Sequence, residues 1–177
     1  MRILVSACLL GVCCKYSGGH NACQAVQDLA RTHCLIPVCP EQLGGLPTPR
    51  VPAERQGELV KDRDGRDVTS CFSRGAEQAA LLAAQLEVPC AVLKSRSPSC
   101  GVGRIYDGSF TGRLIPGSGV TAQKLAASGL PVFSEEELDD LARFLAQNEP
   151  KVYQKCTKSE PKVTETRGFL CSEPEDG

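Results

Sequence analysis

The sequence predicts an α/β domain built on a mostly parallel sheet with helices on both faces. Three short apolar runs, residues 3–7, 34–38 and 90–93, have the length of buried strands rather than helices. Helix-like segments lie between them. The order strand, helix, strand, helix, strand is typical of a parallel sheet.

The first half of the chain contains two of these strands. Apolar side chains at helical spacing predict a helix over residues 21–32, with Asn21 as its cap, and this helix leads to the strand at 34–38. Residues 40–54 are too rich in proline and glycine for a regular element. Their apolar residues disfavour disorder, so we interpret this long loop as a wall of an active site.

The second half continues the alternation. A broad stripe of alanine and leucine predicts a helix over residues 75–87, which leads into the strand at 90–93. An Asp-Gly pair predicts a hairpin within residues 105–114. A further helix is expected to end near residue 127, with Gly129 as its stop.

The last predicted elements lie before a polar tail. Residues 130–133 form a short strand, and Ser134 followed by Glu137 predicts a capping box that opens a final helix. Beyond it the chain is polar and has no periodicity, which indicates a flexible tail. We therefore expect a single domain over residues 1–149 and a disordered tail over residues 150–177.

Composition and charge exclude several classes of function. The chain has 177 residues, 41% hydrophobic and 23% charged, as in one globular domain. A formal net charge of -1 provides no general field for nucleic acid or anionic lipid. With no Trp, three Tyr and five Phe, a broad base-stacking surface is not expected.

The cysteine content raises the question of compartment. Eleven cysteines are an odd number and cannot all pair as disulfides. Residues 5–8 look like a lipoprotein cleavage box, but the few residues before them fall short of the roughly 7 to 15 apolar residues of a signal peptide. No run reaches the roughly 18 apolar residues needed to span a membrane. We expect a cytoplasmic protein whose reduced thiols are available to a metal.

Three cysteines occupy equivalent places. Cys8, Cys39 and Cys100 each follow a predicted strand closely. Parallel strands end at one edge of a sheet, where ligands bind, so these thiols are expected to meet. Together they could hold a metal or an iron-sulfur cluster. The alternative is that Cys8 and Cys39 are small buried hydrophobes. We prefer that interpretation for Cys34 and Cys90, which lie inside predicted strands.

Other polar residues would stand beside such a cluster. Glu41, two residues after Cys39, could act as a general acid or base, or could be a solvated loop carboxylate. Ser97 and Ser99 could donate hydrogen bonds to a substrate or satisfy the backbone of a turn.

Two further features stay open at the level of sequence. The adjacent Cys13 and Cys14 could supply a fourth ligand or a redox pair, or could be incidental loop thiols. The free N–H groups of residues 117–119, just before a helix, could bind an anion or form a simple turn. The two histidines, His20 and His33, are interpreted as structural or solvated, which weakens a Cys/His zinc site.

At these residues the sequence resembles the 2-thiouracil desulfurase family, formerly a domain family of unknown function. The matching segments follow one another in the family's order and cover the chain to about Phe133. They are Ser6–Gly11, Cys39–Glu41, Gly44–Arg50, Pro52–Glu54, Ser97–Gly101 and Gly119–Thr121.

The resemblance implies a Rossmann-like domain that carries a 4Fe-4S cluster on three cysteines, which correspond to Cys8, Cys39 and Cys100. It implies that the fourth iron takes the sulfur of a thiocarbonyl, releasing sulfide and leaving a carbonyl. The family's catalytic Glu and Ser correspond to Glu41 and Ser97.

The resemblance further implies a small thiolated pyrimidine such as 2-thiouracil as substrate, and iron-sulfur assembly machinery as a partner. We expect substrate contacts at Ser99, Gly119, Val120 and Thr121. One departure is Ser17, where the family usually has Asp in a basic-Tyr-Asp-Gly stretch. It puts contacts from that loop in doubt.

Two other classes of function compete with the enzyme. The same cysteines would serve an iron-sulfur sensor or sulfur-binding protein without turnover, although such a protein needs neither Glu41 nor Ser97 as chemical groups. A structural zinc domain would instead have closed tetrahedral coordination. Whether the substrate is a base, a nucleoside or thiolated RNA is left open, and the near-neutral charge argues against a large RNA.

Overall fold

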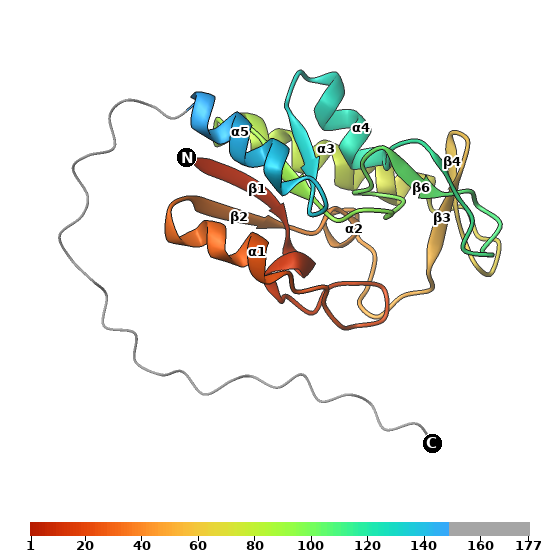
Figure 1. Ribbon diagram of the computed structural model, residues 1–177. Coiled ribbons are helices and arrows are strands. Elements are labelled where there is room, and N and C mark those ends of the chain that lie inside the picture. The colour runs from red at the N-terminus through yellow and green to blue at the C-terminus, as the bar shows by residue number, and fades with distance from the viewer. Residues whose placement is uncertain (149–177) are drawn as a thin grey trace.

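A four-stranded parallel sheet forms the centre of the computed structural model, which describes residues 1–148 (Figure 1). Its strand order is β2-β1-β5-β8, and every neighbouring pair is parallel. The strands are β1 (Arg2–Ser6), β2 (Cys34–Val38), β5 (Ala91–Leu93) and β8 (Val132–Ser134). The predicted fold class is confirmed, and the strand bounds differ from prediction by two residues at most. Cys90 is buried as expected, but the prediction of a buried Cys34 is wrong, because Cys34 is exposed at the start of β2.

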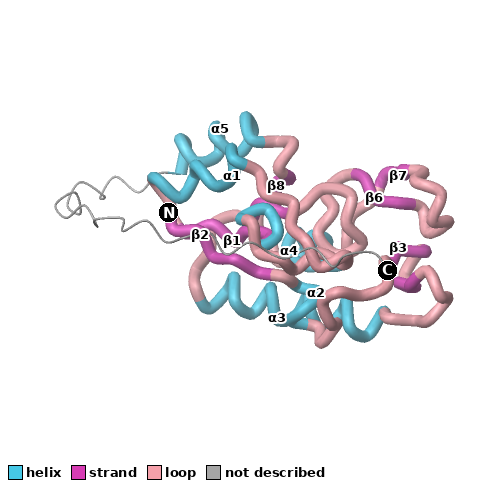
Figure 2. Tube along the Cα trace, turned by 90° about the horizontal axis from the view of Figure 1, so that it is seen from below, coloured by secondary structure: helices cyan, strands magenta, loops and turns pink. Residues whose placement is uncertain are grey.

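Helices cover both faces of this sheet (Figure 2). One face carries α1 (Gln24–Gln27) and α5 (Leu138–Asn148), with a 3-10 helix, η2 (Asp28–Arg31), directly after α1. The other face carries α2 (Pro40–Leu43), α3 (Thr69–Gln85) and α4 (Val120–Ala127). A further 3-10 helix, η1 (Ala7–Leu10), follows β1.

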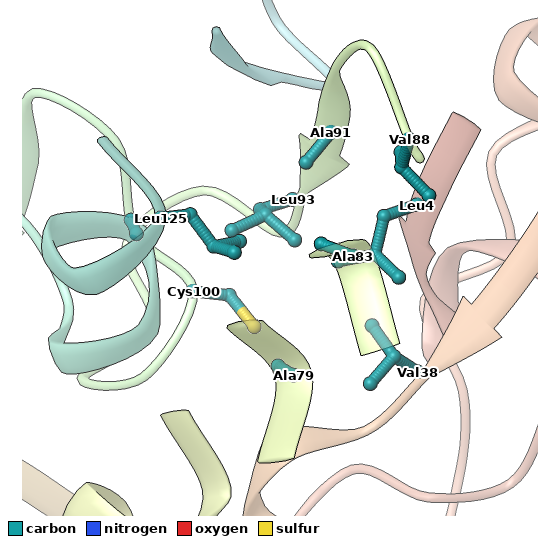
Figure 3. Packing of buried hydrophobic residues seen from close by; sticks show 10 residues of the cluster. Leu4, Val38, Ala79, Ala83, Val88, Ala91, Leu93, Cys100 and Leu125 are labelled. Atoms are coloured by element: carbon teal, nitrogen blue, oxygen red, sulfur yellow. The ribbon is translucent and has the colours of Figure 1, made fainter. Parts of the chain in front are cut away.

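The side-chain alternation of β1 divides the core in two, because successive residues of a strand point to opposite faces. Leu4 packs in the cluster formed with α3 and α4, which includes Ala83 and Leu125 (Figure 3). Ile3 and Val5 pack in the second cluster, on the side of α1 and α5. All three β1 side chains are fully buried, so β1 contributes to both halves of the core. β5 does the same, with Leu93 in the first cluster and Val92 in the second.

The order of the strands also places a crevice. From β1 the chain moves to β2 on one side of the sheet, and it later returns to β5 and β8 on the other side. In open parallel sheets, ligands bind at the carboxyl edge where the strand order reverses in this way. Here that position lies between β1 and β5.

Two small antiparallel hairpins stand beside this edge. One pairs β3 (Ala53–Gln56) with β4 (Leu59–Asp62), and the other pairs β6 (Arg104–Tyr106) with β7 (Leu114–Pro116). The second confirms the predicted hairpin, but a long loop, residues 107–113, replaces the tight Asp-Gly turn. α2 was not predicted, because proline and glycine dominate residues 40–54. The first hairpin was not predicted either, because β4 lies in a polar and charged stretch.

Two helix starts differ from the sequence prediction. The helix expected over residues 21–32 is broken into α1 and η2, and Cys23 rather than Asn21 precedes it as the cap. The helix expected over residues 75–87 begins earlier, at Thr69. Polar residues hid this first part of α3, where Phe72 is the buried side chain.

The end of the described chain follows the prediction more closely. The backbone N–H and the Oγ of Ser134 both donate to Glu137 Oε2 at 2.8 Å, although α5 begins only at Leu138. Gly129, with φ +82, follows α4 as expected. The predicted tail lies outside the described residues. None of the helices within residues 1–148 is both long and apolar enough to cross a bilayer.

The backbones of α2 and α3 touch through a pair of glycines. A Cβ added at Gly75 would lie 1.9 Å from the carbonyl oxygen of Pro40, and one added at Gly44 would lie 2.0 Å from that of Cys71. Both distances are far below any real Cβ contact. The pair therefore fixes α2 on α3, and with it Cys39, which caps α2.

We predict that Gly75→Ala destabilises the protein. Alanine is about 1 kcal/mol better than glycine inside a helix. The clash with Pro40 outweighs this gain, so a net loss of about 1 to 3 kcal/mol is expected, as for overpacked cores. Gln78→Ala, at an exposed position of the same helix, is the control and should leave stability nearly unchanged. Urea unfolding measures both variants, and a Gly75→Ala protein as stable as the control would show that the helices can separate freely.

Candidate active site

A cavity of about 470 Å³ lies at the carboxyl edge of the sheet. Segments that follow β1, β2 and β5 form its floor, and the two hairpins supply side chains to its wall. The residues predicted for the metal and the chemistry all line it: Cys8, Cys39, Cys100, Glu41 and Ser97. Residues from the hairpins and their loops that line it are Ala53, Glu54, Tyr106, Phe110 and Gly112. The long loop after Cys39 does form part of the wall, through Arg50 and Pro52.

Each of the three thiols is positioned by a different element. Cys8 lies in η1, directly after β1, and is half-buried. Cys39 occupies the N-cap of α2 with extended backbone, and is also half-buried. Cys100 is buried, and Figure 3 shows its sulfur within the cluster that includes Leu93 and Ala79. Strands far apart in the sequence thus bring three soft donors to one cavity.

A fourth thiol stands among them. Of the adjacent pair left open by the sequence, Cys14 lines the cavity and is only 1% exposed. The Cys39 Sγ lies 3.7 Å from the Cys14 carbonyl oxygen.

The pKa values of the four thiols in the cavity are shifted in opposite directions. The hydrogen bond from Cys14 lowers the pKa of Cys8 to about 7 and that of Cys39 to about 6. The same contacts raise the pKa of Cys14, because its proton is shared with two sulfurs that favour the thiolate. Burial raises the pKa of Cys100 to about 12. Metal binding at Cys100 must therefore displace a proton, as it does at any thiol ligand.

Ser97 shapes the loop that carries Cys100. Its Oγ accepts the backbone N–H groups of Ser99 and Cys100, both at 3.1 Å. Since a hydroxyl can accept two hydrogen bonds and donate one, its proton is left as the donor that a bound molecule could use.

The start of α4 holds the same loop from behind. The backbone N–H groups of Gly119, Val120 and Thr121 donate at 2.8 to 2.9 Å to carbonyl oxygens between Pro98 and Gly101. A Cβ at Gly119 would lie 2.3 Å from the Ser99 carbonyl oxygen, so only glycine permits this approach. The sequence left open whether the N–H groups of residues 117–119 bind an anion or form a turn. Those of Gly117 and Gly119 donate to the carbonyl oxygens of Gly103 and Gly101, at 3.1 and 2.8 Å.

The residues predicted for substrate contact have packing roles in this structure. Ser99 and Thr121 are fully buried, and their hydroxyls are 2.9 Å apart. Neither they nor Gly119 and Val120 are among the residues that line the cavity. Substrate contact at these four positions stays a prediction. Ser17, the departure from the family pattern, is not among the lining residues either.

Arg50 connects the carboxylate to the cysteine loop. Its Nε donates to Glu41 Oε2 at 2.7 Å, and its Nη2 donates to the Cys14 carbonyl oxygen at 3.0 Å. Its Nη1 donates to the Pro47 carbonyl oxygen and to Thr48 Oγ1. The side chains of Arg50 and Glu41 are 6% and 17% exposed. Arg50 was not predicted to be a site residue. The only signal in the sequence is a cation in a largely apolar loop, because a buried cation needs hydrogen-bond partners.

Cations surround the thiols. The residues with positive charge that line the cavity are Lys15, Arg50, Arg63, Lys94 and Arg96, against the carboxylates of Glu41 and Glu54. Lys94 follows β5 directly and pairs with Glu135 at the end of β8. Positive charge close to a thiol favours its ionised form, and Lys94 and Arg50 lower the pKa values of Cys8 and Cys39 in this way.

This donor set fits an iron-sulfur cluster. Within residues 1–148, no three Cys, His, Asp or Glu side chains are placed to share a single metal ion. A cluster requires a different arrangement. Each thiolate would bind a different iron, so the ligands must be spread around the space that the cluster would fill. Three thiols on the wall of one cavity, with cations beside them to offset thiolate charge, meet that requirement.

The fold and this site define a Rossmann-like α/β protein with a cysteine-lined cofactor cavity at its switch point. A family model described as 2-thiouracil desulfurase matches residues 3–137, so the chain belongs to that family. The uncharacterized protein YbbK of Bacillus subtilis (strain 168) is 42% identical over 149 residues, which cover 78% of this chain and 99% of that protein.

A solved structure is similar as well. It is described as the 4Fe-4S-dependent thiouracil desulfidase TudS, with a TM-score of 0.78 and 46% identity, and the match covers 82% of this chain and 98% of that chain. The resemblance inferred from the cysteine, glutamate and glycine motifs is therefore confirmed.

We predict that Arg50→Met destabilises the protein by about 1 to 3 kcal/mol, the cost of leaving partly buried polar groups without their hydrogen-bond partner. Methionine keeps much of the stem but removes every donor, so Glu41 and the Cys14 carbonyl lose their bonds. Arg113→Met is the control, because its ion pair with Asp107 is long, at 3.8 Å, and the Arg113 side chain is 76% exposed. Urea unfolding of the metal-free proteins measures both. Equal stability of the two variants would contradict a structural role for the Arg50 contacts.

Proposed function

We propose that this protein removes sulfur from a thiolated pyrimidine such as 2-thiouracil, using a 4Fe-4S cluster held by Cys8, Cys39 and Cys100. The observation that carries the proposal is that these thiols, Glu41 and Ser97 line one cavity. The similarity to TudS, described as a 4Fe-4S-dependent thiouracil desulfidase, supports both the cofactor and the reaction.

The overall reaction consumes neither oxidant nor reductant. 2-Thiouracil and water give uracil and hydrogen sulfide, so a C=S bond is replaced by a C=O bond. When bound, the cluster would supply a Lewis-acidic iron with affinity for soft sulfur. The protein must then place the base, deliver water to its carbon atom and move the protons.

Glu41 is placed for the proton transfers. It stands in the first turn of α2, and Arg50 fixes one of its carboxylate oxygens at 2.7 Å. The carboxylate can then accept a proton from the attacking water and return it to the ring or to the departing sulfur. Because Arg50 is itself held by three other acceptors, the carboxylate is presented in one orientation.

Ser97 is placed for orientation. Its Oγ already accepts two backbone N–H groups, so its hydroxyl proton can be donated to an oxygen or nitrogen of the base. The same serine holds the Cys100 loop, which relates the position of the base directly to a ligand of the cluster. Reduced thiols at this site suit a reducing compartment, so we place the activity in the cytoplasm, with iron-sulfur assembly machinery loading the cluster.

The test is anaerobic reconstitution with iron and sulfide, removal of excess sulfide, and incubation with 2-thiouracil while sulfide and uracil are measured. We predict that Glu41→Gln keeps its iron content and loses about 10² to 10⁴-fold in kcat/KM, the usual contribution of general acid-base catalysis. Its amide oxygen can still accept the Arg50 bond. Glu58→Gln, at a side chain 92% exposed, is the control and should keep full activity.

The Cys8→Ala, Cys39→Ala and Cys100→Ala variants should lose cluster and activity together. A Glu41→Gln enzyme with full iron content and full activity would refute the acid-base role. A loaded wild-type protein that releases no sulfide from 2-thiouracil would move the assignment to another thiolated substrate or to a cluster-carrying sensor.

A further inference from the structure

Phe110 is an aromatic residue of the cavity that the proposed chemistry does not use. It belongs to the loop between β6 and β7, residues 107–113, where it is half-buried and lines the cavity. It is not a member of either core cluster of the described residues. Packing in the core therefore does not explain why an aromatic residue stands at this position.

The backbone of Phe110 is held in an unfavourable conformation. Its φ is +56, a left-handed value that is rare for a bulky residue. Such a conformation costs free energy and persists only where the surrounding structure enforces it, most often at active sites and ligand clamps. Strain at a residue of the cavity wall therefore indicates a functional role, provided that specific contacts enforce it.

Two side chains of β3 supply those contacts. Glu54 and Gln56 are two residues apart and so lie on the same face of the strand. The Phe110 N–H donates to Glu54 Oε2 at 2.9 Å, and Gln56 Nε2 donates to the Gly108 carbonyl oxygen at 2.6 Å. Glu54 is only 9% exposed, and a hydrogen bond is stronger in such a setting than in water. The first hairpin thus fixes the loop of the second at the cavity wall.

A cation holds the ring itself. The Arg63 guanidinium lies over the Phe110 ring, 5.8 Å from its centroid, and Arg63 also lines the cavity. A cation over one face of the ring leaves the opposite face for another flat group. A pyrimidine is such a group, because every base has a π-face that can stack on an aromatic side chain.

We propose that Phe110 is the stacking surface for the pyrimidine ring and makes the enzyme selective for flat, conjugated thiocarbonyl compounds. This inference rests on the proposed function, because it names the residue that recognises the ring in the same cavity. Glu54 and Arg63 are then positioning residues that act through Phe110. One stacking residue also agrees with the low aromatic content of the chain, which disfavours only a broad stacking surface.

A matched pair of ligands separates stacking from the other contacts. Uracil, the product of the proposed reaction, and 5,6-dihydrouracil have the same carbonyl and N–H groups, but only uracil is a flat, conjugated ring. Carboxylates and hydroxyls of the cavity meet the same groups in both compounds. Neither compound is consumed, so their dissociation constants can be measured by isothermal titration calorimetry on the anaerobically reconstituted protein.

We expect Phe110→Ala and Phe110→Leu to bind uracil about 10- to 100-fold more weakly than the wild type, the usual effect of removing one stacking contact. Binding of 5,6-dihydrouracil should change little. Phe110→Tyr and Phe110→Trp keep the π-face and should keep the preference for uracil. All four variants retain a Cβ, so the strained φ is common to them. Leu59→Ala is the control, because Leu59 is 44% exposed and absent from the lining of the cavity.

Several results would overturn the proposal. Uracil binding to Phe110→Ala and Phe110→Leu that equals binding to Leu59→Ala would show that the ring is not used. An equal loss for uracil and 5,6-dihydrouracil would show a general disturbance of the cavity. Loss of iron uptake in Phe110→Ala and Phe110→Leu would make Phe110 a structural residue.

Sulfide release from 2-thiouracil distinguishes this proposal from the proposed function. If the wild type releases sulfide and Phe110→Ala does so with the same kcat/KM, the stacking surface fails and the function stands. If the loaded wild type releases none but binds uracil through Phe110, the reaction fails and the stacking surface stands. A loaded wild type that neither releases sulfide nor binds uracil refutes both.

Discussion

Parallel pairing of β1 with both β2 and β5 is the constraint on which the site depends. It aligns the carboxyl ends of three strands at one edge, and the segments that follow these ends carry Cys8, Cys39 and Cys100. The register of this pairing is protected by burial, because Ile3, Leu4 and Val5 are completely enclosed by helices on both faces. A slip by one residue would exchange the two faces of the core and carry Cys8 away from its partners.

The strands alone do not hold the loops, and two sets of backbone contacts and one arginine side chain complete the site. The glycine pair of α2 and α3 fixes the helix that presents Cys39 and Glu41. The first amides of α4 hold the Cys100 loop, which explains why a glycine stands at position 119. Arg50 joins Glu41 to the Cys14 carbonyl oxygen. Motifs that are separate along the sequence therefore contact one another around the cavity. These contacts fix the positions of the thiols and the carboxylate relative to one another.

Much of this arrangement could be predicted from the sequence, because strand-length apolar runs followed by cysteine carry both the topology and the location of the thiols. The residues that support the site could not. Arg50 bonds to Glu41 and to the Cys14 carbonyl oxygen, which are not its neighbours in the sequence. These bonds depend on the conformation of the proline-rich loop, which hydrophobic periodicity cannot predict. Cys14 is recognised as part of the site only when the fold places it in the lining of the cavity, with its carbonyl oxygen 3.7 Å from the Cys39 Sγ. The sequence also could not decide whether the N–H groups of residues 117–119 bind an anion or form a turn, because their partners, the carbonyl oxygens of Gly103 and Gly101, are known only from the fold.

We propose that cysteines from the segments that follow three strands hold one cluster in one cavity. The most direct measurement is a crystal structure of the protein reconstituted anaerobically with iron and sulfide. We expect a single 4Fe-4S cluster bonded to Cys8, Cys39 and Cys100, with its fourth iron facing the cavity beside Glu41 and Ser97. A cluster or a zinc ion bound by a different set of cysteines, or a cluster whose fourth iron is bonded to Cys14, would contradict it.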